Sequence, residues 1–265
     1  MAPQDMASIG DHLRAWRERN RLSQLHCALE ADISQRHLSF LETGRSRPSR
    51  DMIIHLADRL NIPLRDRNAA LLAAGFAPAY SERGLDDPEM KAARAALETI
   101  LAGHEPYPAL AIDRHWQMLH ANAAIGPLLS GVGNAELLRP PVNVLRLSLH
   151  PQGLAPGIEN LGEWRAHLLH RLGRQIAATQ DEVLIELRRE LLGYGAVPGP
   201  DEGAASVGVF VPLRLKTPDG VLSFISTTTV FGTPRDVLLS ELAIEAFFPA
   251  DPQTAQHLKG ALRAG

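Results

Sequence analysis

Side chains that can bond to the edges of DNA bases stand together in one short segment of the chain. Gln35 and Arg36 open a predicted helix, and each has a planar group that can make two hydrogen bonds to one base in the major groove. Gly44 allows the helix to stop, and Arg45 and Arg47 follow at once. Arginines beyond the end of such a helix suit phosphates. This segment therefore predicts a surface that binds DNA.

Two short helices joined by a tight turn would position these groups, which is the layout of a helix-turn-helix. Ser23 is expected to cap the first helix and Ser34 the second. The residues expected to face inward at helical spacing are Leu25, Ala28, Leu29, Leu38 and Leu41. The alternative is an ordinary helical hairpin followed by a solvated basic loop.

The candidate DNA-contacting residues lie on both helices and in the loop that follows. They are Gln24, Ser34, Gln35, Arg36, His37, Ser39, Phe40, Thr43, Arg45 and Arg47. Phe40 would touch a thymine methyl group or else pack against the next helix. Gln24 would meet a phosphate at a helix N-terminus. Arg17 would reach the DNA backbone, or it would simply lie on an amphipathic helix surface.

The charge of the chain supports a focused DNA surface rather than a general affinity for polyanions. The formal net charge is -3. Residues 1–80 nevertheless hold 11 Lys and Arg against 9 Asp and Glu, and residues 34–50 hold four arginines against Glu42 alone. Only this local patch is suited to a polyanion.

The chain is expected to form two domains. Residues 1–80 predict an all-α domain of five helices, with Leu13 and Trp16 in the first helix and Ser49 at the start of the fourth. The fifth is expected over residues 64–74. Residues 81–104 form an expected linker with a helix near 89–102, and residues 105–265 an α+β domain with an antiparallel sheet.

Alternating and helical patterns of apolar residues divide the second domain into predicted strands and helices. A hairpin is expected over 109–113 and 116–121, and two further strands over 207–215 and 221–231 on either side of a turn at 217–220. Between them lie two predicted helices, the second capped by Thr179 and Glu182. A final helix is expected after Thr233.

An apolar pocket is expected between this sheet and its helices. The candidate ligand-binding residues are Trp116, Trp164, Leu168, Leu172, Val209, Val211, Leu213, Phe224 and Phe231. Arg165 or Arg214 would hold a ligand carboxylate at the mouth. The alternative is a filled hydrophobic core.

Other reactive residues do not form a recognisable catalytic or metal-binding pattern. His167 and His170 stand one helical turn apart, with His120 and His150 elsewhere, but two such ligands do not make a metal site. Cys27, the single cysteine, is expected to fill the core. We expect no metal, no cofactor and no enzymatic activity. With no long apolar run and no secretion signal, a cytosolic location without membrane contact is expected.

Two resemblances extend these inferences over nearly the whole chain. The N-terminal part resembles the lambda-repressor-like helix-turn-helix family, often called the XRE type. The matching residues are Leu22, Ser23, Gln24, Ala28, Ala31, Ile33, Ser34, Pro48 and the run from Leu41 to Arg45. Cys27 and Asp32 depart from that family's usual Leu and Gly.

The second part resembles the MmyB-like regulators. The matching residues are Pro78, Asp113, Trp116, and the segments 107–110, 122–124, 231–237 and 247–251. This resemblance implies a PAS-like domain that binds a small ligand, with fatty acids the suspected class. Together the patterns predict a homodimeric transcription regulator that binds a double-stranded DNA operator and senses a fatty-acid-like molecule. The rival is a constitutive DNA-binding dimer whose second domain only dimerises.

Overall fold

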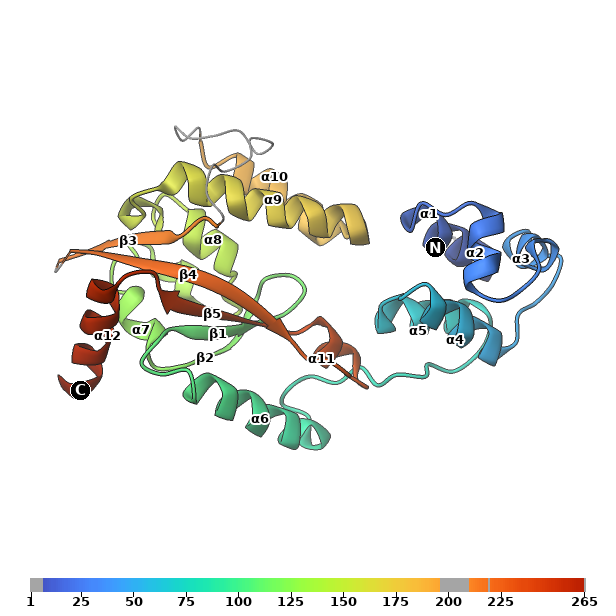
Figure 1. Ribbon diagram of the computed structural model, residues 1–265, viewed down its shortest axis with the longest axis horizontal. Helices are drawn as coiled ribbons and strands as arrows, with labels where there is room; N and C mark the ends of the chain where they lie inside the picture. Colours follow the sequence, from blue (N-terminus) through green and yellow to red (C-terminus); the bar gives the residue numbers. More distant parts are fainter. Residues whose placement is uncertain (1–6, 196–209, 219, 265) are drawn as a thin grey trace. The chain divides into compact units, whose positions relative to one another are not determined.

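The computed structural model describes residues 7–195, 210–218 and 220–264, and the chain folds into two compact units (Figure 1). The N-terminal unit comprises Met1–Gly84 together with Gly232–Ser240, and the C-terminal unit comprises Leu85–Phe231 together with Glu241–Gly265. Among the described residues no helix is long and apolar enough to cross a membrane.

Five helices lie between residues 9 and 73 of the N-terminal unit, as the sequence predicts. They are α1 (Ile9–Arg19), α2 (Gln24–Glu30), α3 (Gln35–Glu42), α4 (Arg50–Arg59) and α5 (Leu64–Ala73). Serine begins each of the first four. The hydroxyl oxygens of Ser8, Ser23, Ser34 and Ser49 each accept a hydrogen bond from the backbone N–H three residues later. These caps satisfy N–H groups that the helix itself leaves unbonded, so they fix where each helix begins.

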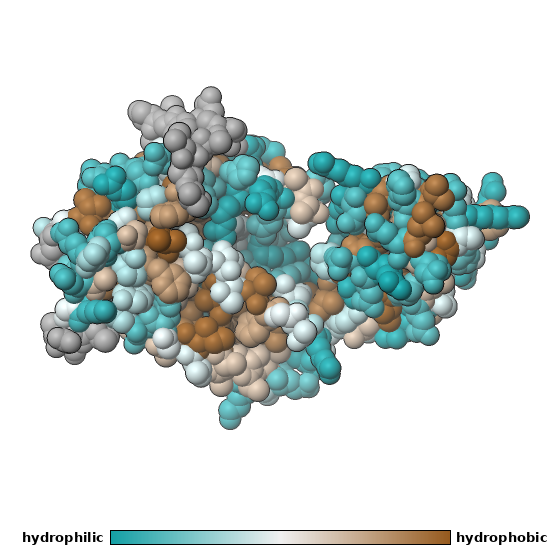
Figure 2. All heavy atoms as spheres, viewed as in Figure 1, coloured by the Kyte–Doolittle hydropathy of each residue, from teal (hydrophilic) through white to brown (hydrophobic). Residues whose placement is uncertain are grey.

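The core of this unit confirms Leu38 and Leu41 as inward-facing but corrects the inner face of α2. Leu25 is 50% and Leu29 67% exposed, whereas Cys27 and Ala28 are buried. The prediction that Leu25 and Leu29 face inward was therefore wrong. The helix has seven residues and rotates its two smallest apolar side chains toward α3, which allows the two helices to pack closely. Figure 2 shows the resulting hydrophobic surface over α2.

The C-terminal unit is an antiparallel sheet with helices on both faces. Its strands are β1 (Ala109–Ile112), β2 (Met118–Ala121), β3 (Leu213–Thr217), β4 (Gly220–Val230) and β5 (Ala243–Pro249). Its helices are α6 (Lys91–Ala102), α7 (Ile125–Leu128), α8 (Val144–Leu149), α9 (Leu161–Thr179), α10 (Glu182–Leu192) and α12 (Pro252–Ala264). In the sequence, the boundary between the two units falls within α11 (Val237–Glu241). The strand order is β2-β1-β5-β4-β3. The predicted fold, helical and then α+β, is confirmed.

Strand alternation separates two cores on the two faces of this sheet. Leu110 and Ile112 of β1 pack into a large core with α8, α9 and α10, whereas Ala109 and Ala111 pack with α6 on the opposite face. Figure 1 shows α6 and α9 on opposite sides of the strands. Successive side chains of a strand point to opposite faces, so a short apolar run can serve both cores.

Three local predictions in this unit need correction. Residues 243–249 form the central strand β5, which the sequence reading missed, and the last helix is α12 rather than the short α11. Asp181, not Thr179, caps α10 by accepting the backbone N–H of Val183. The Thr179 hydroxyl instead donates to a carbonyl within α9. Asp181 stands two residues nearer α10 than Thr179, where its carboxylate reaches the free N–H groups.

The hairpin of β3 and β4 follows the predicted pairing only in part. Leu213 pairs with Phe224 and Leu215 with Leu222, as alternation on one buried face requires. Strand β3 begins at Leu213. Val211, which was predicted to belong to this strand, therefore lies outside it. Val207 and Val209 lie outside the described residues.

Candidate DNA-binding and ligand-binding sites

The start of α3 presents the predicted base-reading side chains to solvent. Ser34 caps the helix, and Gln35 and Arg36 are its first two residues, both exposed. Leu38 and Leu41 on the opposite side are buried. Asp32 has a φ of 52°, so it takes the left-handed turn position that glycine usually fills. The turn thus leaves the first residues of α3 free to enter a groove.

The guanidinium groups of two arginines lie over the ring of Phe40. Its half-buried ring lies 5.3 Å from the guanidinium carbon of Arg36 and 5.9 Å from that of Arg45. Both distances are within the range of a cation–π contact. Phe40 therefore holds Arg36 and Arg45 beside each other on the exposed side of α3.

The loop after α3 supplies unpaired positive charge. Gly44 has a φ of 71°, and Arg45 and Arg47 beyond it are exposed. Within the described part of the chain, neither forms an ion pair with a carboxylate. His37 and Ser39 are half-buried, and the Thr43 hydroxyl donates to the Ser39 carbonyl at 2.7 Å. Free guanidinium groups at this position suit phosphates.

A buried ion pair ties together the three helices of this surface. Glu42, at the end of α3, accepts hydrogen bonds from Arg17 of α1 at 2.7 and 3.2 Å and from the Gln24 amide at 2.8 Å. The hydrogen bond to Glu42 also raises the pKa of Arg17. Arg17 thus has a structural role in joining α1 to α3, and its contact to the DNA backbone stays a prediction. The Gln24 side chain is used in this contact, so the predicted contact of Gln24 to a phosphate would depend on its backbone N–H at the start of α2.

Cys27 lies in the core of this unit. It is 1% exposed, and burial raises the pKa of its thiol to about 11. The thiol therefore stays protonated at physiological pH, where a protonated thiol is a weak nucleophile.

A small apolar cavity lies inside the C-terminal unit, between the sheet and α9. Its volume is about 100 Å³. Four predicted ligand residues line it: Trp116, Trp164, Leu168 and Leu213. Further walls come from leucines of α7 and α8 and from Phe247 of β5. The indole nitrogen of Trp164 donates to Ser148 at 3.0 Å, which fixes the ring.

The other predicted ligand residues lie elsewhere. Leu172 and Phe224 are fully buried in the same core but do not line the cavity. Phe231 packs in the second core with α6, on the other face of the sheet. Val211 is half-buried beside the main core, and Val209 lies outside the described residues.

The cavity has a charged wall that the sequence reading missed. Arg171 and Glu245 both line it, and the Arg171 guanidinium contacts the Glu245 carboxylate at 2.7 and 3.3 Å. Arg171 also lies 4.8 Å from the ring centroid of Trp116. Arg171 follows Leu168 by three residues on α9, so the two side chains lie on the same face of the helix. This spacing could have indicated that Arg171 faces the cavity.

The two arginines predicted to hold a ligand carboxylate are engaged in other contacts. Arg214 pairs with Glu159 at 2.7 Å, and Arg165 donates to the carbonyl oxygens of Leu191 and Leu192. Neither lines the apolar cavity. His167 stacks on Trp164, and no group of three metal-ligating side chains occurs among the described residues.

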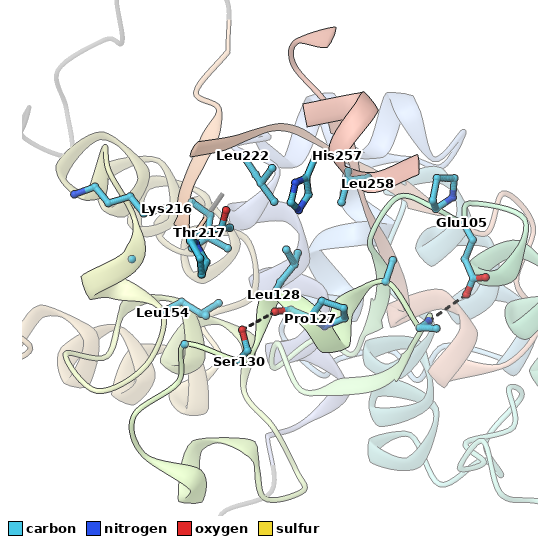
Figure 3. A pocket seen from close by; sticks show the side chains of 17 residues that line it. Glu105, Pro127, Leu128, Ser130, Leu154, Lys216, Thr217, Leu222, His257 and Leu258 are labelled. Atoms are coloured by element: carbon cyan, nitrogen blue, oxygen red, sulfur yellow. Dashed lines mark hydrogen bonds between the residues drawn. The ribbon is translucent and has the colours of Figure 1, made fainter. Parts of the chain in front are cut away.

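A larger pocket adjoins the apolar cavity. Its volume is about 710 Å³. Figure 3 shows Leu222, His257 and Leu258 on one side of it and Pro127, Leu128 and Leu154 on the other. Leu128, Leu154 and Leu215 line both this pocket and the apolar cavity. The two spaces therefore share one leucine wall.

Comparisons with known proteins assign a family to each part of the chain. Residues 8–70 match a helix-turn-helix domain family, and residues 93–260 match the MmyB-like transcription regulator ligand binding domain. A search of curated proteins finds none that matches the chain. The second match covers more than half of the chain, so the protein belongs to the MmyB-like transcription regulators, as a DNA-binding regulator with a ligand-binding C-terminal domain.

Proposed function

We propose that this regulator binds its operator as a homodimer in the cytoplasm and that its C-terminal unit senses a fatty-acid-like molecule. The observation that carries the ligand proposal is that the larger pocket and the apolar cavity adjoin and share the same lining leucines. Small-molecule pockets typically measure about 300–1,000 Å³ and are mostly apolar. The larger pocket has this size, and the apolar cavity is lined mostly by apolar side chains, including the indole rings of Trp116 and Trp164.

The ligand proposal is tested by what the purified protein carries. Native mass spectrometry, compared with the denatured mass, should reveal a bound small molecule that organic extraction identifies. Added fatty acid should raise the melting temperature with its concentration, because a ligand that binds only the folded state stabilises it. A melting temperature that does not respond to any fatty acid would contradict the proposal.

DNA recognition is predicted to depend on Arg36 and Arg45 in different ways. Arg36→Ala should cost about 1–3 kcal/mol of operator binding and relax the choice of base at one position per half-site. Arg45→Ala should weaken binding to all sequences alike. It should also reduce the slope of log binding constant against log salt concentration by about one. Competition binding at several salt concentrations measures both. Unchanged operator preference in Arg36→Ala would show that α3 does not read the bases.

Dimerisation is predicted because one small helix-turn-helix unit contacts few base pairs. Two half-sites about one helical turn apart, roughly 34 Å, would give tight specific binding. The C-terminal unit is proposed to carry the two-fold interface. Residues 1–80 alone should then sediment mainly as a monomer and bind the operator weakly, while the whole chain sediments as a dimer. A monomeric full-length chain at operator-saturating concentration would contradict this.

A second candidate function is a constitutive DNA-binding dimer. One observation favours it: the apolar cavity, at about 100 Å³, is smaller than a typical ligand pocket. Leu172 and Phe224 of the same core are fully buried. Under this alternative the C-terminal unit only dimerises. Operator affinity would then be the same with and without saturating fatty acid, whereas a sensor should change it by about five- to a hundredfold. Under either function we propose no catalytic activity.

A further inference from the structure

A polar pocket adjoins the apolar cavity and shares two of its lining residues. Trp116, Arg171, Arg174 and Gln175 line it, and its volume is about 370 Å³. Trp116 and Arg171 also line the apolar cavity. One indole ring and one guanidinium group therefore stand between an apolar space and a polar one.

Hydrogen bonds hold three of the four side chains of this pocket in place, those of Trp116, Arg171 and Gln175. The indole nitrogen of Trp116 donates to the Gln175 oxygen at 2.8 Å, and the Gln175 amide donates to the Arg114 carbonyl at 2.6 Å. Arg171 is fixed by Glu245 and by the Thr228 hydroxyl at 3.0 Å. A site with fixed donors loses little conformational entropy when a ligand binds.

The pocket carries one uncompensated positive charge. Glu245 neutralises Arg171, whereas Arg174 is exposed and has no acidic partner among the residues that the structure describes. Nearby Arg114 pairs with Asp181 at 3.4 Å and with Glu241 at 3.8 Å. An anion beside Arg171 and Arg174 would therefore complete the charge balance, and a planar guanidinium matches a carboxylate well.

We propose that this pocket binds the carboxylate of an amphipathic ligand, between Arg171 and Arg174, while the apolar chain enters the cavity past Trp116. The inference rests on the proposed function, since it places the polar end of the same ligand. The larger pocket offers no comparable site. Its charged lining residues are Glu105 and Lys216, of opposite sign, and Figure 3 shows the Lys216 amine pointing away from it.

The test compares two probes of equal chain length, dodecanoate and dodecan-1-ol, on the full-length protein. Binding is measured by calorimetry, and thermal unfolding gives an independent measurement. Dodecanoate should bind roughly tenfold more tightly, as expected for a charge-assisted hydrogen bond at a half-exposed site. Added salt should weaken dodecanoate binding and leave dodecan-1-ol binding unchanged.

Arg174→Gln is the decisive variant because this exposed side chain supports no other contact in the described structure. It should bring the two probes to within about threefold of each other by weakening dodecanoate alone. Lys216→Gln is the matched control, with the same loss of charge at the larger pocket, and it should keep the full preference. Arg171 is left in place because its removal would strand the buried Glu245 carboxylate.

Each other outcome overturns a different statement. Equal affinity of the two probes for the unchanged protein would overturn the carboxylate site and leave a ligand-binding domain. A loss of preference in Lys216→Gln but not in Arg174→Gln would place the carboxylate in the larger pocket instead. Failure of both probes to bind or stabilise the protein would contradict the proposed fatty-acid-like ligand itself.

Discussion

Glu42→Gln is expected to lower the free energy of unfolding of the N-terminal unit by about 3–5 kcal/mol. Glu42 is 3% exposed and accepts hydrogen bonds from both Arg17 and Gln24. Neutralising the carboxylate leaves the Arg17 guanidinium, whose side chain is 14% exposed, without its buried charge partner. An amide at the same place also turns one acceptor into a donor that faces other donors.

The loss should appear across three helices at once. Arg17 lies on α1, Gln24 on α2 and Glu42 on α3, so the ion pair links the whole helix-turn-helix. Amide hydrogen exchange of the full-length protein, read on peptides from α1 to α3, measures the opening free energy of this unit alone. Operator affinity should fall with it, because α3 is held by the same contacts.

Glu18→Gln provides the matched control. It removes the same charge beside the same arginine, but Glu18 lies 3.6 Å from Arg17 and is 63% exposed. A solvated pair of this kind contributes about 0–1 kcal/mol. If the two variants lost the same stability, the buried pair would not be what joins the helices.

The sequence predicted the features of the N-terminal unit that depend on neighbouring residues. Caps such as Ser23 and Ser34 act within three residues, so they can be read directly from the chain. The inner face of α2 depends on how close α3 approaches, and a seven-residue helix has too short a pattern to show this. Leu25 and Leu29 were misplaced for that reason.

Partners distant in sequence account for what was missed in the C-terminal unit. Strand β5 runs through the centre of the sheet, yet a carboxylate, Glu245, interrupts its apolar pattern. Glu245 is buried because Arg171, 74 residues earlier, meets it there. A charged residue in a strand does not by itself indicate burial, and the helical spacing of Arg171 from Leu168 was not used, so the strand and the charged wall of the cavity were both overlooked. The apolar wall was easier to predict, since Trp164 and Leu168 lie on one helical stripe.

Trp164→Ala is expected to lower the free energy of unfolding of the C-terminal unit by about 3–5 kcal/mol, as for other buried aromatic residues. Trp164 is 4% exposed, stacks on His167 and donates to Ser148. Its removal should enlarge the apolar cavity and leave the Ser148 hydroxyl without this partner. Hydrogen exchange of α8 and α9 should report the loss, while α1 to α3 stay unchanged.

Leu172→Ala separates a ligand wall from an ordinary core. Leu172 lies on the same helix and is fully buried, and its truncation should cost about 2–5 kcal/mol, but it does not line the cavity. Both variants should therefore be destabilised, whereas only Trp164→Ala should lose affinity for dodecanoate, because only Trp164 would contact the chain of the ligand. Equal losses of affinity in both variants would mean that binding follows the stability of the fold, and the cavity beside Trp164 would then be no more than an imperfection in the core packing.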